Sequence, residues 1–98
     1  MKIEEIFYHA SFQKDLRKLS VQDVGLAAIA EDTFRKTPLD PSLGIHKLSG
    51  RLRGAWAIVV SHKIRIIFVP VEPAGTIVFL SVGPHDLYDT VHRRLRSL

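Results

Sequence analysis

The chain has 98 residues, 46% of them hydrophobic and 24% charged, which fits one globular domain and argues against disorder. It has no cysteine, which excludes disulfides, thiol nucleophiles and thiolate metal sites, and it shows neither an apolar run long enough to cross a bilayer nor a secretion signal. The net charge is +4, and we predict a basic, cytoplasmic, single domain over residues 1–98.

The first part of the chain is predicted to form one strand and a helical hairpin. Residues Ile3 to His9 alternate loosely between apolar and polar side chains, which favours a strand. Ser11 is expected to cap a helix, and Ser20 a second helix that ends at Thr37-Pro38. The positions expected to face the core are Phe12, Leu16 and Leu19 in the first helix and Leu26, Ile29, Ala30 and Phe34 in the second.

The second part is predicted to form a long loop, three strands and a helix. The loop runs from Pro38 to Arg53 and is broken by proline and glycine. Strands rich in Ile, Val and aromatic residues follow, joined by short turns that favour an antiparallel meander. They cover Ala55 to Val60, Lys63 to Val69 and Thr76 to Val82. The spacing of Leu87, Val91 and Leu95 predicts a terminal helix, so the fold class is α+β in the order β, α, α, β, β, β, α.

Basic residues are concentrated where acidic residues are absent. No carboxylate lies between Asp40 and Glu72, and three arginines stand near the end of the chain. Scattered surface lysines and arginines can serve solubility alone, but an acid-free window favours a polyanion. The candidates for RNA binding are Lys47, Arg51, Arg53, Lys63, Arg93 and Arg94.

Three residues could perform the chemistry of RNA cleavage. His46 lies in the long loop, Arg65 in the second meander strand, and His85 directly after the third strand. Two histidines can take the proton of a 2′-hydroxyl and protonate the leaving 5′-oxygen, while an arginine stabilises charge on the phosphoryl group. Such a mechanism requires neither a metal nor a cofactor. For Arg65 an ion pair with Glu4, Glu5 or Asp86 is an equally weighted alternative.

Two aromatic residues offer surfaces on which an RNA base could stack. Trp56 alternates with Ile58 and Val60 on one strand face, which favours a place in the core. Tyr88, near the start of the last helix, is the better stacking candidate, with packing at the rim of the sheet as the alternative.

Three stretches of the sequence resemble the RelE/ParE superfamily of bacterial type II toxins. They are Phe12-Gln13-Lys14-Asp15-Leu16-Arg17-Lys18-Leu19, then His46-Lys47-Leu48-Ser49-Gly50 continuing to Gly54-Ala55-Trp56, and Arg65-Ile66-Ile67-Phe68 with Gly83-Pro84-His85-Asp86-Leu87-Tyr88. Their order agrees with the predicted elements over essentially the whole chain.

The resemblance implies a compact sheet packed against a helical hairpin and, in the RelE/YafQ-like branch, an endoribonuclease that cuts messenger RNA on the ribosome. His46 and His85 match two histidines of YafQ-like members, Arg65 matches an arginine of RelE-like members, and Gly83 matches the glycine before the last site residue. The expected partners are a cognate antitoxin, in a toxin-antitoxin hetero-oligomer, together with messenger RNA and the ribosome.

The sequence also departs from these relatives. Ala57, Ile58 and Val59 occupy the strand where RelE-like toxins carry lysines and YafQ-like toxins a histidine, and Lys63 replaces a YafQ-like aspartate. Two other functions therefore stay open. One is a ParE-like poison of DNA gyrase without nuclease activity, and the other is a noncatalytic relative that binds an antitoxin.

Overall fold

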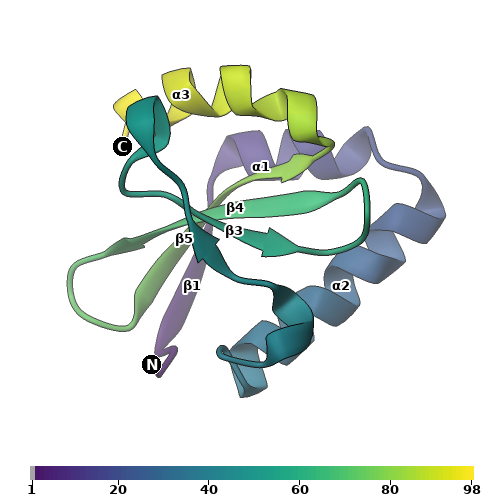
Figure 1. Ribbon diagram of the computed structural model, residues 1–98, viewed down its shortest axis with the longest axis horizontal. Helices are drawn as coiled ribbons and strands as arrows, with labels where there is room; N and C mark the ends of the chain where they lie inside the picture. The colour runs from purple at the N-terminus through teal and green to yellow at the C-terminus, as the bar shows by residue number, and fades with distance from the viewer. Residues whose placement is uncertain (1) are drawn as a thin grey trace.

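The computed structural model describes residues 2–98, with the backbone but not the side chain of His85. A five-stranded mixed sheet separates two helices on one face from a third helix on the other (Figure 1). In chain order the helices and strands are β1 (Glu5–Tyr8), α1 (Ala10–Arg17), α2 (Val21–Lys36), β2 (His46–Lys47), β3 (Trp56–Val59), β4 (Arg65–Val71), β5 (Thr76–Gly83) and α3 (Tyr88–Arg96). Three short 3-10 turns are η1 (Pro41–Leu43), η2 (Gly50–Leu52) and η3 (His85–Leu87).

The sheet has the strand order β1-β5-β4-β3-β2. The predicted antiparallel meander of β3, β4 and β5 is confirmed, and β1 adds to its edge in parallel with β5. The predicted long loop contains an additional strand, because His46 and Lys47 pair with Ala57 and Trp56 at the opposite edge. Two residues are too few to show an alternating pattern, so the sequence carried no signal for β2.

The predicted cap of α2 is confirmed, whereas the predicted cap of α1 is not. Ser20 caps α2 by accepting from the Asp23 N–H at 3.1 Å, as expected. The expected cap of α1 was wrong, because His9 Nδ1 takes that place and accepts from the Ser11 N–H at 3.1 Å. The Ser11 hydroxyl instead donates to the Leu80 carbonyl on β5 at 2.6 Å, which ties α1 to the sheet.

The core between the sheet and the helical hairpin is built around three phenylalanines. The ring of Phe34 lies 5.0 Å from that of Phe68 and 5.9 Å from that of Phe79, measured between centroids. Trp56 packs against this core, as predicted. The inward placement of Ile29 was wrong: it is 66% exposed, because the buried stripe of α2 runs through Ala27, Ala30 and Phe34 and leaves Ile29 on the outer face.

The other face of the sheet is covered by α3. Leu87, Val91 and Leu95 pack on Ala57 and Ile67 of the sheet, which confirms the predicted terminal helix. Within residues 2–98, no helix combines the length and apolar character that crossing a membrane requires. The two cores place β4 and β5 at the centre of the domain, so both strands are rigid supports for any side chain at their ends.

Candidate active site

The face of the sheet under α3 brings His46 and Arg65 near each other. His46 lies opposite Ala57 in the β2–β3 ladder, and Ala57 lies opposite Ile67 in the β3–β4 ladder. Directly paired residues share a face, and Arg65, two positions before Ile67, shares it as well. With strands about 5 Å apart, the Cα atoms of His46 and Arg65 are separated by roughly 12 Å, a span that one phosphodiester and two long side chains can fill.

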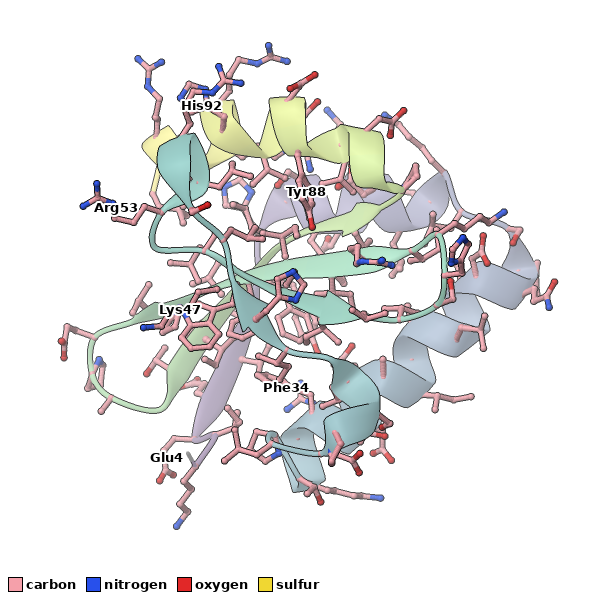
Figure 2. All side chains as sticks on the ribbon, in the orientation of Figure 1. Glu4, Phe34, Lys47, Arg53, Tyr88 and His92 are labelled. Carbon is pink, nitrogen blue, oxygen red and sulfur yellow. The ribbon has the colours of Figure 1, made fainter. Side chains whose placement is uncertain are left out.

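Tyr88 adds a phenol to this face from the start of α3. Figure 2 shows its side chain extending from the helix toward the sheet, where it packs on the apolar cluster under α3. Burial raises the pKa of the Tyr88 phenol above its ordinary value of 10.0, while the nearby charge of Arg65 lowers it. The phenol is therefore protonated at neutral pH and can donate a hydrogen bond to an anionic oxygen.

Arg65 is held by the turn between β3 and β4. Its Nη1 donates to the carbonyl oxygens of Ser61 at 2.6 Å and His62 at 3.3 Å. Among the side chains that the structure describes, no carboxylate lies within ion-pair distance of Arg65, so the alternative of a pair with Glu4, Glu5 or Asp86 is not observed. The guanidinium is thus oriented by carbonyls, which fix its position without neutralising its charge.

His46 is exposed at the opposite edge and oriented by one contact. Its Nδ1 lies 2.9 Å from the Gly44 carbonyl oxygen, and because a carbonyl only accepts, Nδ1 carries the hydrogen. The other ring nitrogen, Nε2, is then the proton acceptor of the neutral ring. Gly44 is left-handed, with φ of 52°, and an added Cβ would lie 3.0 Å from Val59 Cγ2, so this turn favours glycine.

His85 follows the end of β5. Its backbone begins η3, two residues after Gly83, and Gly83 lies opposite Arg65 in the β4–β5 ladder. The side chain of His85 lies outside the described part of the structure, so its predicted role stays a prediction. Leu87 Cδ2 lies 2.8 Å from where a Cβ on Gly83 would be, so glycine lets the turn after β5 pack closely on the strand.

Two predicted RNA-binding lysines lie away from this face. Lys47 pairs with Trp56 and places its Nζ 5.3 Å from the centre of the Trp56 ring, on the side opposite His46. Lys63 was expected to begin the strand that carries Arg65, and this was wrong. β4 begins only at Arg65, so Lys63 lies in the turn, where its Nζ is 3.9 Å from Asp23 Oδ2.

The arginines predicted to bind RNA from α3 and from the loop before β3 form two groups, one exposed and one largely buried. Arg51, Arg53 and Arg93 are exposed, Arg51 lies 3.9 Å from Asp89, and Figure 2 shows Arg53 pointing outward. Arg94 is different, because it forms a largely buried ion pair with Asp15. Sequence reasoning missed Asp15, whose position on the helix gave no sign that its partner would come from the other end of the chain.

The strand positions at which the family resemblance implies lysines are part of the core here. Ala57 and Ile58 are 0% exposed and Val59 is half-buried. None of the three can present a cation to RNA. On this face the described structure offers instead the guanidinium of Arg65, the imidazole of His46 and the phenol of Tyr88.

Comparison with solved structures identifies the fold. YafQ from E. coli strain BL21(DE3) matches with a TM-score of 0.71 at 17% identity, covering 87% of this chain and 96% of that one. A mutant of E. coli toxin RelE in the free state matches with 0.70 at 14%, covering 98% of each chain. The toxin-antitoxin complex RelBE2 from Mycobacterium tuberculosis matches with 0.60 at 20%, covering 83% and 96%.

These similarities define the small RelE/YafQ/ParE toxin fold, and this chain has that fold. No protein-family model matches the sequence, and no curated protein has a significantly similar sequence. Several of the matched structures are named as toxins or toxin-antitoxin complexes, while the shared identity is low enough that the likeness concerns the fold.

Proposed function

We propose that this chain is the toxin of a type II toxin-antitoxin pair and acts in the cytoplasm as a metal-independent, ribosome-dependent messenger RNA endoribonuclease. The observation that supports it most is the common placement of Arg65, Tyr88 and His46 on the α3 face of the sheet. Arg65 has a preset orientation and no described carboxylate partner, which suits it to bind a phosphate.

The proposed reaction is a transesterification in RNA. His46 Nε2 takes the proton of a 2′-hydroxyl, and the 2′-oxygen attacks phosphorus and forms the new P–O bond. The bond from phosphorus to the 5′-oxygen breaks, and His85 gives that oxygen a proton, which leaves a 2′,3′-cyclic phosphate and a 5′-hydroxyl. Arg65 and Tyr88 donate hydrogen bonds to the phosphoryl oxygens as their negative charge grows.

Positive charge near the site supports a polyanionic substrate. Arg51, Arg53 and Arg93 are exposed around η2 and α3, the helix that carries Tyr88. We propose that these residues contact the phosphate backbone of the messenger RNA or of the ribosome. Lys47, Lys63 and Arg94 have other contacts in the isolated chain, so they are the weaker candidates among the predicted set.

The antitoxin is the second proposed partner. Exposed apolar side chains remain on the surface of the isolated chain, including Phe7 on β1 and Val21 and Ile29 on α2. An extended or helical segment of a partner would cover such side chains, and one similar structure is named as a toxin-antitoxin complex. Expression of the chain alone should therefore be harmful, and a harmless, monodisperse chain would contradict this part of the proposal.

One observation favours two other candidate functions. Ala57 and Ile58 are buried where RNA-cleaving relatives carry strand lysines, which fits a gyrase poison or a noncatalytic antitoxin-binding relative. These functions need no cation on β3.

One experiment separates the candidates. The wild-type chain is induced in bacteria and messenger RNA 5′ ends are mapped within minutes, with His85→Ala as the control. New cuts inside translated reading frames, absent from the control, are the expected result. Growth arrest with intact messages and inhibited gyrase would replace the proposal with the gyrase poison, and no arrest would replace it with the noncatalytic relative.

A further inference from the structure

A buried polar network lies where β5 passes between α1 and α3. The Asp15 and Arg94 side chains retain 11% and 19% of their exposure, and they meet through two hydrogen bonds, Nη1 to Oδ2 at 2.5 Å and Nη2 to Oδ1 at 3.0 Å. Nη1 also donates to the Ser81 hydroxyl at 2.7 Å, and Ser81 is fully buried. A two-point contact of this kind fixes both the distance and the angle between the helices.

Asp15 also completes the edge of the sheet. β1 pairs with β5 only as far as Phe79, and beyond that point α1 lies along the open edge of β5. There the Val82 N–H donates to Asp15 Oδ2 at 3.2 Å. The Asp15 carboxylate therefore accepts a hydrogen bond from the backbone of β5 and also binds the Arg94 guanidinium on α3. Moving either β5 or α3 would break one of these contacts.

The network joins both ends of the segment that carries the proposed chemistry. It contacts Ser81 and Val82 at the end of β5 and Arg94 on α3, and the chain between them includes His85 and Tyr88. Apolar contacts already press α3 onto the sheet, but such contacts are not directional and allow a helix to slide. The ion pair adds the directional constraint that sets the register of α3.

We propose that Asp15 and Arg94 are positioning residues for the RNA-cleaving site, holding the segment that bears His85 and Tyr88 in register with Arg65. This inference rests on the proposed nuclease function. Gly83 begins that segment and lies opposite Arg65, so the network is built on the same strand end as the site. A displacement of about 1 Å in a reacting group can cost on the order of 100-fold in rate.

The test compares Asp15→Asn and Arg94→Lys with wild type on ribosomes programmed with messenger RNA. Arg94→Lys keeps a charge beside Asp15 and loses the two-point contact, so it is the milder variant if Asp15→Asn does not fold. Asp32→Asn is the matched control, because it removes an exposed ion pair of α2 with Lys36. The expected result is a fall in kcat of about ten-fold or more with little change in KM, in Arg94→Lys but not in the control.

A second readout is independent of cleavage. In a Tyr8→Phe background Tyr88 is the only tyrosine, and its absorbance titration reports its surroundings. We expect Arg94→Lys to move this titration to lower pH, as Tyr88 becomes more solvated, while Trp56 fluorescence shows an intact core. An unchanged kcat together with an unchanged Tyr88 titration in the folded variant would overturn the positioning role. If wild type cuts no RNA but Arg94→Lys still shifts the Tyr88 titration, the positioning role of the ion pair would stand. The proposed nuclease function would then be overturned.

Discussion

His46 and Lys47 are adjacent in the chain and project from opposite faces of the sheet. His46 pairs with Ala57, which lies under α3, whereas Lys47 pairs with Trp56 and covers its ring. Variants of His46 and Lys47 can therefore be compared directly, because the two residues are neighbours that differ in the face of the sheet they occupy.

His46→Ala is expected to lower kcat for messenger RNA cleavage by about 10²–10⁴, because a general base typically contributes that much. Lys47→Ala should leave kcat nearly unchanged and cost only about 0.5–1 kcal/mol of stability through the lost contact with Trp56. Single-turnover cleavage on programmed ribosomes measures the first effect and urea unfolding the second. Equal losses of activity in the two variants would remove His46 from the mechanism.

Arg65→Gln is expected to lower kcat by about 10²–10³, the usual effect of losing one donor to transition-state charge. Arg65→Lys should recover part of the rate, since it restores the charge without the planar fork. Arg35→Gln on α2 is the matched control, because Arg35 is an exposed arginine paired with Glu31 and lies outside the site. A structural role would show instead as a loss of stability in Arg65→Gln at unchanged kcat, caused by the lost bonds to the Ser61 and His62 carbonyls.

The pKa of Tyr88 predicts a pH dependence of stability. Burial raises this pKa above 10.0, so the unfolded chain loses the phenol proton at a lower pH than the folded chain does. The contribution to stability is complete below about pH 10 and is lost as pH rises through the folded pKa. Urea midpoints of wild type should therefore fall between about pH 9 and about pH 11, and Tyr88→Phe should fall less.

Tyr8 provides the comparison for this measurement. Its pKa is also raised, first by burial and then by its hydrogen bond to Glu31, so Tyr8→Phe should likewise reduce the alkaline loss. The double variant should show the smallest loss of the set. If Tyr88→Phe loses as much stability as wild type over this range, the burial of the phenol under α3 is contradicted.

The sequence predicted the elements whose signals are local. The stripe of Leu87, Val91 and Leu95 identified α3, and the Ile- and Val-rich runs identified β3, β4 and β5. It could not predict β2, because a strand of two residues exists only through its pairing with β3. It also could not assign the capping role of His9, since the hydroxyl of Ser11 is drawn to the distant Leu80 carbonyl.

The sequence predicted which residues belong to the candidate site better than it predicted how they are arranged in space. The residue types of His46 and Arg65 predict their chemistry, whereas their common face follows from the strand register, which no sequence pattern determines. The buried ion pair of Arg94 was not predicted, because a sequence does not show which arginine meets a buried carboxylate 79 positions away. Long-range pairing of this kind is decided by tertiary packing.

The hairpin core gives a stability prediction that does not depend on function. Phe34 is fully buried and packs at a tilt against Phe68 and Phe79, so Phe34→Ala should lower the free energy of unfolding by about 3–5 kcal/mol through lost burial and an unfilled cavity. Ile29 lies on the same helix and is 66% exposed, so Ile29→Ala should stay within about 0.5 kcal/mol of wild type. Urea unfolding followed by Trp56 fluorescence measures both. Comparable losses in the two variants would show that α2 is rotated from the orientation described, with Ile29 turned toward the sheet.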